Sequence, residues 1–158
     1  MLHKIAFSQI KGNNPQMAAG ILAQIGSEQE FFTLSETALA SRLGFRSQIL
    51  SDTYRQELLR RAQLEIPFIA DNGIRAIYYT DNDYPRRLLE CDDAPAMIFV
   101  LGKANLNASH VISIVGTRNA TLYGVSFINS LVDELADRIE HTLDPSALED
   151  IYLPFKPK

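Results

Sequence analysis

The sequence predicts an α/β protein in which a small helical module is followed by the beginning of a parallel sheet. Through residues 1–72, apolar residues recur every three or four positions between glycine stops, as in short amphipathic helices. From Ile74 the pattern changes to short, nearly continuous apolar runs, which are typical of strands covered on both faces. An amphipathic helical stretch follows the third run, as in the strand, loop and helix that open a doubly wound fold.

Helical spacing, caps and glycine stops predict five helices in the first part. We place Asn14 as an N-cap before Pro15, and Ser35 as the cap of ETALASRL. We expect Pro67 to kink the last helix. The predicted helices cover about residues 2–10, 15–25, a short stretch from 27, 36–43 and 47–72. Such a set of short helices is typical of a SAM-like or helix-hairpin-helix module.

The turn KGNNP, residues 11–15, has two interpretations. In DNA-binding helix hairpins, a glycine-x-glycine turn lets backbone N–H groups approach a phosphate. Here Asn14 stands at the second glycine position, where its side chain crowds such a contact. We favour the other interpretation, in which Gly12 only ends a helix.

The second part contains three predicted strands and an amphipathic helix. The strands cover residues 74–80, 96–102 and 111–116, with a short helix begun by Pro85 between the first two. The stretch YGVSFINSLVDELADRI forms the amphipathic helix, and an atypical tail with three prolines follows. We therefore divide the chain into residues 1–72, 74–136 and 137–158. Because three strands and one helix leave an open sheet edge, we expect residues 74–136 to associate with a second copy or to stay partly disordered.

Composition limits the class of protein. The chain has 158 residues, 46% of them apolar, and a formal net charge of −4, so a polyanion would have to bind at a local site. Cys91 is the single cysteine, and the amino terminus lacks the apolar core of a signal peptide, from which we expect a cytoplasmic protein. No run approaches 18 apolar residues, and we expect no membrane partner.

A candidate anion site follows the third predicted strand. In an open α/β sheet, ligands bind beyond the carboxyl ends of the strands, near the positive end of the next helix. Glycine lets the main chain turn there, short polar side chains add donors or caps, and an arginine fork matches phosphate. The alternative is a solvated Arg118 and a Thr121 that merely caps a helix. The candidate residues are Gly116, Thr117, Arg118, Asn119, Thr121, Tyr123 and Gly124.

The sequence shows no catalytic or metal-binding pattern, and we expect neither an enzyme nor a bound cofactor. The three glycines of the dinucleotide fingerprint and the lysine of a P-loop are absent. The three histidines are scattered, and CDD at 91–93 is interpreted as a solvated acidic loop. Arg86 and Arg87 are expected on an exposed helix. Tyrosines that could stack on bases are interpreted as packing residues, with Tyr123 as the exception.

The stretches YTDNDYPRRLLECDDAPAMIFVLG and VISIVGTRNATLYG together closely resemble the DNA-processing protein family DprA, also called Smf. Its members show a Tyr-Pro, a proline before an apolar strand ending in Gly, and a Val-Gly-Ser/Thr-Arg…Tyr-Gly motif. The resemblance covers residues 1 to about 136. It implies an extended Rossmann-like domain and a non-enzymatic cytoplasmic protein that binds single-stranded DNA in natural transformation and helps to load the recombinase RecA. By this resemblance Gly116, Thr117 and Arg118 belong to the DNA-binding pocket, and Tyr123 and Gly124 close the motif.

The chain departs from the family pattern after Gly124. The family's later Ser-Gly-x-Ala-x-Gly-Ile-Asp stretch does not follow. Instead, ADRIEHTLDPSALEDIYLPFKPK is similar to a segment of the transcription accessory protein Tex. We expect a junction between about Leu131 and Ile139, and a truncated Rossmann-like domain with impaired function.

Two other functions remain open on the sequence. One is a nucleotide or nucleoside-phosphate hydrolase of the lysine-decarboxylase-like Rossmann group, which needs a Pro-Gly-Gly motif and a downstream catalytic Glu that are not visible here. The other is a helical protein-interaction module with a vestigial Rossmann start.

Overall fold

The computed structural model describes residues 1–109 and 119–142, with side chains in the second range described as far as residue 135. The chain divides into two compact units, Met1–Gly102 and Lys103–Lys158. In the described part, no helix combines the length and the apolar character needed to cross a membrane.

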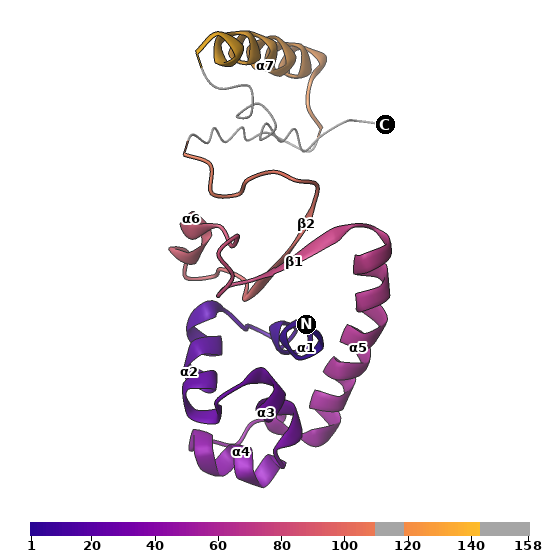
Figure 1. Cartoon of the computed structure of the whole chain (residues 1–158), viewed down its shortest axis with the longest axis vertical. Coiled ribbons are helices and arrows are strands. Elements are labelled where there is room, and N and C mark those ends of the chain that lie inside the picture. Colours follow the sequence, from indigo (N-terminus) through magenta and orange to yellow (C-terminus); the bar gives the residue numbers. More distant parts are fainter. Residues whose placement is uncertain (110–118, 143–158) are drawn as a thin grey trace. The chain divides into compact units, whose positions relative to one another are not determined.

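Helices make up most of the first unit (Figure 1). Their order agrees with the prediction, except that a 3₁₀ turn stands where the long helix was expected to begin. The elements are α1 (Leu2–Ser8), α2 (Pro15–Ile25), α3 (Glu28–Thr33), α4 (Glu36–Leu43), the 3₁₀ turn η1 (Gln48–Leu50) and α5 (Asp52–Asp71). Pro67 lies inside α5, which continues to Asp71.

Side-chain caps define where these helices begin. Asn14 Oδ1 accepts a hydrogen bond from the Met17 N–H at 2.8 Å, and Ser35 Oγ accepts one from the Ala38 N–H at 3.3 Å, which confirms both predicted caps. Ser51 does the same for Tyr54 at 3.3 Å and sets the start of α5 at Asp52. Gly44 follows α4 with φ +72°, a left-handed conformation that glycine adopts without strain.

The sheet is antiparallel, so the prediction of a parallel pair is wrong for these two strands. Strand β1 (Ile74–Tyr78) pairs with β2 (Met97–Leu101) in a register that joins Tyr78 to Met97 and Ile74 to Leu101. The connection between them holds only α6 (Arg86–Leu89), four residues long or about 6 Å. A parallel crossover has to carry the chain back along a strand of about 17 Å, so this connection favours the antiparallel return.

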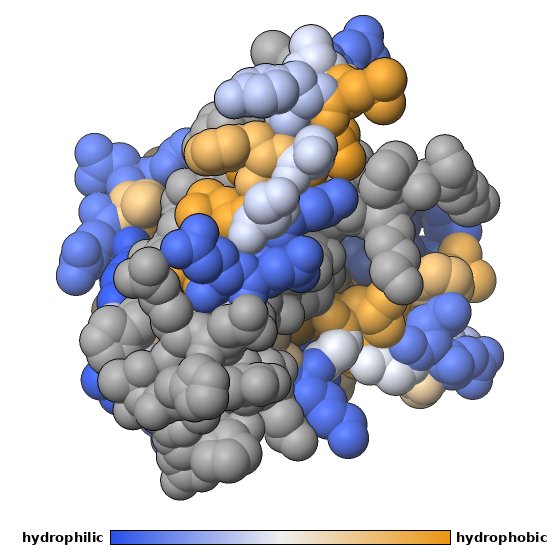
Figure 2. Space-filling view, turned by 90° about the horizontal axis from the view of Figure 1, so that it is seen from above, coloured by the Kyte–Doolittle hydropathy of each residue, from blue (hydrophilic) through white to orange (hydrophobic). Residues whose placement is uncertain are grey.

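The apolar run of β2 is not covered on both faces within the described residues, contrary to expectation. Met97 is buried, whereas Phe99 and Leu101 are 49% and 62% exposed. Figure 2 shows that hydrophobic side chains reach the surface of the described part of the molecule. A continuous apolar run therefore does not by itself identify a fully buried strand.

The core of the first unit joins the helices to the sheet. Helix α1 packs against α5 and α3, and α5 also contacts β1. Tyr78, Ala96 and Met97 belong to the same buried cluster as the helical residues. The helical part of that cluster consists of Ile5, Ala6, Phe7, Ile10, Ala18, Ile21, Ile25, Phe31, Phe32, Leu39, Leu43, Leu50, Leu58 and Ala62. Helices and strands thus bury their apolar faces against one another.

The second unit contributes one described element, helix α7 (Leu122–Thr142). It confirms the predicted amphipathic helix and runs a few residues past its expected end near residue 139. The predicted strand at 111–116 and residues 143–158 of the predicted tail lie outside the described residues.

Candidate nucleic-acid interface

The candidate anion site divides into a part that the structure describes and a part that it does not. Gly116, Thr117 and Arg118 lie outside the described residues. The remaining four, Asn119, Thr121, Tyr123 and Gly124, lie at the beginning of α7, where Asn119, Thr121 and Tyr123 are exposed.

Thr121 caps α7. Its Oγ1 accepts a hydrogen bond from the Gly124 N–H at 3.1 Å, and its carbonyl oxygen accepts one from the Val125 N–H at 3.0 Å. Gly124 lies close to this cap, because a Cβ built on it would stand 3.3 Å from Thr121 Oγ1. The final Thr and Gly of the motif therefore have a shared structural role in starting the helix.

The first turn of α7 contains no acidic residue, so no carboxylate in that turn would repel a bound anion. Unpaired N–H groups give a helix N-terminus the character of about half a positive charge. An anion placed there would meet favourable dipoles without a neighbouring carboxylate in that turn. Arg118, which lies outside the described residues, precedes Leu122 of α7 by four positions in the sequence.

Two aromatic rings stand exposed beside this helix start. Tyr123 and Phe127 are 80% and 55% exposed, and their rings stack with centroids 6.4 Å apart and planes 24° apart. Tyr123 is a predicted site residue, whereas Phe127 is not among the residues predicted from the sequence. Their spacing of four residues, which places two side chains on one helix face, was the signal that could have found it. Such a pair offers a flat surface of the kind on which nucleobases stack.

The Tyr-Pro motif has a structural role. Tyr84 is 1% exposed, and its hydroxyl donates a hydrogen bond to the Pro95 carbonyl oxygen at 2.5 Å. Burial raises the pKa of the Tyr84 phenol, with a smaller contribution from Cys91. Tyr84 thus ties the chain before α6 to the proline that precedes β2, and its ring is not accessible to a base.

The two asparagines of the KGNNP turn form hydrogen bonds within the protein. Asn13 is buried and its Nδ2 donates to the Phe7 carbonyl oxygen at 2.7 Å, while Asn14 caps α2 and donates to the Asp92 carbonyl oxygen at 3.2 Å. Gly12 has φ +76° and turns the chain between the helices. Because α1 already ends at Ser8, Gly12 does not itself end the helix, as was predicted, but lies in the turn that follows it.

Among the described residues, no group of three or more His, Cys, Asp or Glu side chains is suited to hold a metal ion. His3 stacks on Phe32 with ring centroids 5.9 Å apart, and Cys91 is exposed.

Comparison with known proteins places the candidate site inside a matched segment. The family model described as DNA recombination-mediator protein A matches residues 75–141, which include every candidate residue. The DNA processing protein DprA of Bacillus subtilis (strain 168) is 38% identical over 66 residues, which are 41% of this chain. The match spans 22% of that relative, so the chain corresponds to about a fifth of its length. Residues 1–74 lie outside the family match, and no solved structure matches the chain.

Proposed function

We propose that the chain binds single-stranded DNA in DNA processing, because its residues 75–141 match the family model of DNA recombination-mediator protein A and a segment of it is 38% identical to a DNA processing protein DprA. The observation that carries the proposal is the position of the motif within the match. In the sequence, Gly116, Thr117 and Arg118 come a few positions before a capped helix start that has no acidic residue in its first turn and carries an exposed aromatic pair.

The binding mode follows from these groups. A backbone phosphate lies against Arg118 and the N–H groups at the start of α7, where charge and dipole both favour an anion. Adjacent bases stack on the rings of Tyr123 and Phe127. This stacking has no strong sequence preference, because every base has a π-face. With a net charge of −4, the chain attracts DNA through this local site and not through an overall field.

The wider role follows from the family. We propose that the chain acts in natural transformation and recombination in the cytoplasm, that it binds DNA without catalysing a reaction, and that RecA and a second copy of the chain are its partners. We also propose that residues 1–72 are a SAM-like module and that residues 74–136 begin a Rossmann-like domain.

Fluorescence anisotropy with a labelled single-stranded oligonucleotide of about 15 nucleotides tests the proposal. We expect Arg118→Ala to weaken binding by about tenfold and to lower the salt dependence, because one phosphate contact is lost. If three phosphates are contacted, the affinity of the parent chain falls roughly 20-fold between about 50 and about 200 mM salt. Arg61→Ala is the matched control, since it removes the same charge from the exposed face of α5.

A second pair of variants tests the aromatic surface. Phe127→Ser removes one ring of the stack, and we expect a loss of about 1–3 kcal/mol per lost base contact. Leu122→Ser, at a residue that is 92% exposed and not aromatic, controls for the loss of apolar surface. Binding that is unaffected by Arg118→Ala and by Phe127→Ser would exclude this site as the DNA contact.

A further inference from the structure

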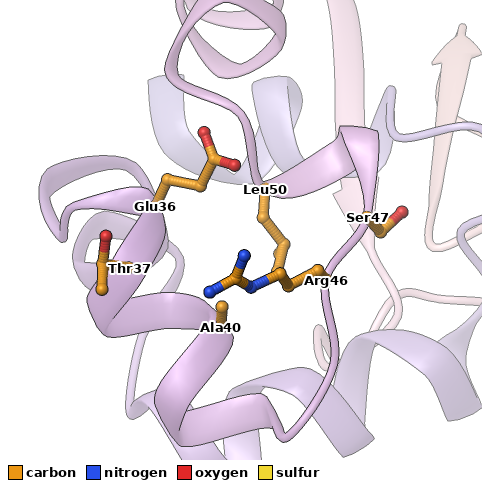
Figure 3. A pocket seen from close by; sticks show the side chains of 6 residues that line it. All are labelled: Glu36, Thr37, Ala40, Arg46, Ser47 and Leu50. Carbon is orange, nitrogen blue, oxygen red and sulfur yellow. The ribbon is translucent and has the colours of Figure 1, made fainter.

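A pocket of ≈ 120 Å³ opens between α4 and the residues that lead into η1. Leu50, which is fully buried, and Ala40 provide its apolar surface, while the polar lining consists of Glu36, Thr37, Arg46 and Ser47. Figure 3 shows the Arg46 side chain reaching across the pocket toward α4, which contributes Glu36 and Thr37. The volume corresponds to about four water molecules, enough for one planar ring at an open site and not for a base pair.

The two charged side chains of this pocket are not used by the fold. Among the described residues, neither Glu36 nor Arg46 takes part in a side-chain hydrogen bond or an ion pair, although both are exposed and line the same cavity. In contrast, Glu57 on α5 holds both Arg60 and Arg61. The pocket therefore offers a ligand the hydrogen-bond donors of the Arg46 guanidinium and the acceptor oxygens of the Glu36 carboxylate, next to an apolar part of its lining.

We propose that this pocket binds a guanine base, an inference that rests on the proposed binding of single-stranded DNA. Guanine carries two acceptors, O6 and N7, on one edge, which match the arginine fork. Its N1–H and N2–H₂ groups donate from the neighbouring edge, and these match a carboxylate. The ring lies between the two side chains with its face toward Ala40, and its Watson–Crick and Hoogsteen edges are both contacted, as in the recognition of bases in single strands.

The other bases fit this arrangement less well. Adenine places the N6–H₂ donor next to N7, so one of its groups opposes the arginine donors. Cytosine and thymine lack the N7 acceptor altogether. A free phosphate would be attracted by Arg46 but repelled by Glu36 on the same pocket. The pairing of opposite charges across the cavity therefore favours guanine.

The experiment uses the whole chain and oligothymidine strands that carry one central purine, because runs of guanine associate with one another. We expect anisotropy titrations to show about tenfold tighter binding when the purine is guanine than when it is adenine. Hypoxanthine removes the N2–H₂ donor that meets Glu36, and 7-deazaguanine removes the N7 acceptor that meets Arg46. Each analogue should lose most of the preference.

Two substitutions test which edge of the guanine base each charged side chain contacts. Glu36→Gln should abolish the discrimination against hypoxanthine, and Arg46→Gln the discrimination against 7-deazaguanine. Glu90→Gln and Arg61→Gln, which make the same changes at exposed positions elsewhere, should retain both. Oligonucleotide binding with equal affinity for all four purines overturns the guanine pocket while it leaves the proposed function standing.

If no oligonucleotide binds, the proposed function is refuted. A second measurement then still tests whether the pocket binds guanine. Titration with guanosine monophosphate should shift the amide NMR signals of Thr37, Arg46 and Ser47, and titration with inorganic phosphate should not. No shift with guanosine monophosphate, or equal shifts with phosphate, overturns the inference.

Discussion

Arg55 is the buried charge on which the first unit depends. It is 2% exposed on α5, and its guanidinium donates to three carbonyl oxygens: Leu50 at 3.0 Å, Phe31 at 2.5 Å and Leu34 at 2.8 Å. Phe31 and Leu34 lie at the carboxyl end of α3, where carbonyl groups lack partners within the helix. Asp52, which is largely exposed, supplies the counter-charge through a hydrogen bond to the guanidinium. One side chain therefore closes α3 and fixes η1 against α5.

Arg55→Met removes these bonds and keeps a side chain of similar length. The three carbonyl groups then stay buried without partners, at about 1 kcal/mol each or more, which gives a loss of at least about 3 kcal/mol. Asp52 adds little, because an exposed carboxylate is solvated on its own. We therefore expect a loss of at least about 3 kcal/mol, a large part of the 5–15 kcal/mol that stabilises an ordinary domain.

Urea unfolding followed by far-ultraviolet circular dichroism measures this loss. Arg55→Lys should recover only part of the stability, because an ammonium group cannot address three carbonyl oxygens in the fork geometry of arginine. Arg60→Met is the control: this arginine is exposed on the same helix and pairs with Glu57, so we expect a change within about 0.5 kcal/mol. A loss below about 1 kcal/mol for Arg55→Met, or a loss equal to that of Arg60→Met, would refute the reasoning.

Three further predictions concern pH, the start of α7 and the surface of α5. Burial, and then the carboxylate of Glu28, raises the pKa of the Tyr78 phenol. Because the folded state holds this proton more tightly, its contribution is complete below about pH 10 and falls at higher pH by up to about 1.4 kcal/mol per unit. Urea midpoints between about pH 9 and 12 should show this slope, and Tyr78→Phe should reduce it; the same slope in that variant would contradict the assignment. Thr121→Ala should cost the first turn of α7 about 1 kcal/mol, seen as faster hydrogen exchange at the Gly124 amide, and Thr121→Ser should restore protection. Hydrogen bonds from Arg60 and Arg61 lower the pKa of the Glu57 carboxyl to about 2, so an NMR titration should find it ionised at pH 3. Replacement of both arginines by glutamine should return the pKa of Glu57 to its ordinary range; an unchanged pKa would show that another group lowers it.

Local signals in the sequence were sufficient to predict the helices of the first unit. Asn14, Ser27 and Ser35 each place a side-chain oxygen three residues before the N–H group that it accepts from, so the capping distance is fixed by the chain itself. Gly44 ends α4 in the left-handed conformation that its residue type favours. These contacts lie within a few residues of one another, and the sequence pattern predicts them directly.

Contacts between distant residues were not predictable in the same way. The pairing of Tyr78 with Met97 depends on the path of the residues between them, and an apolar strand pattern is compatible with either direction. Arg55 looks like any charged residue of an amphipathic helix, because its carbonyl partners on Phe31 and Leu34 are more than 20 positions away in the chain. For the candidate site, the motif and the helix start could be predicted, whereas the pocket that joins Glu36 to Arg46 depends on the fold of the turn between them.

The family match begins at residue 75, but the folded core of the first unit includes residues on both sides of that boundary. This determines which form of the protein has to be used to test the proposed function. The matched segment begins at residue 75, yet its first strands complete the core of the helices that precede it. Tyr78 is 1% exposed and Met97 6%, both inside the helical cluster, and Asn14 bonds to the Asp92 carbonyl oxygen. Removal of residues 1–72 would uncover the apolar side chains of β1 and β2, and removal of the strands would open the helical core. A DNA-binding measurement on either part alone would therefore report on a damaged fold, and the whole chain is the unit in which Arg118, Tyr123 and Phe127 have to be compared with their controls.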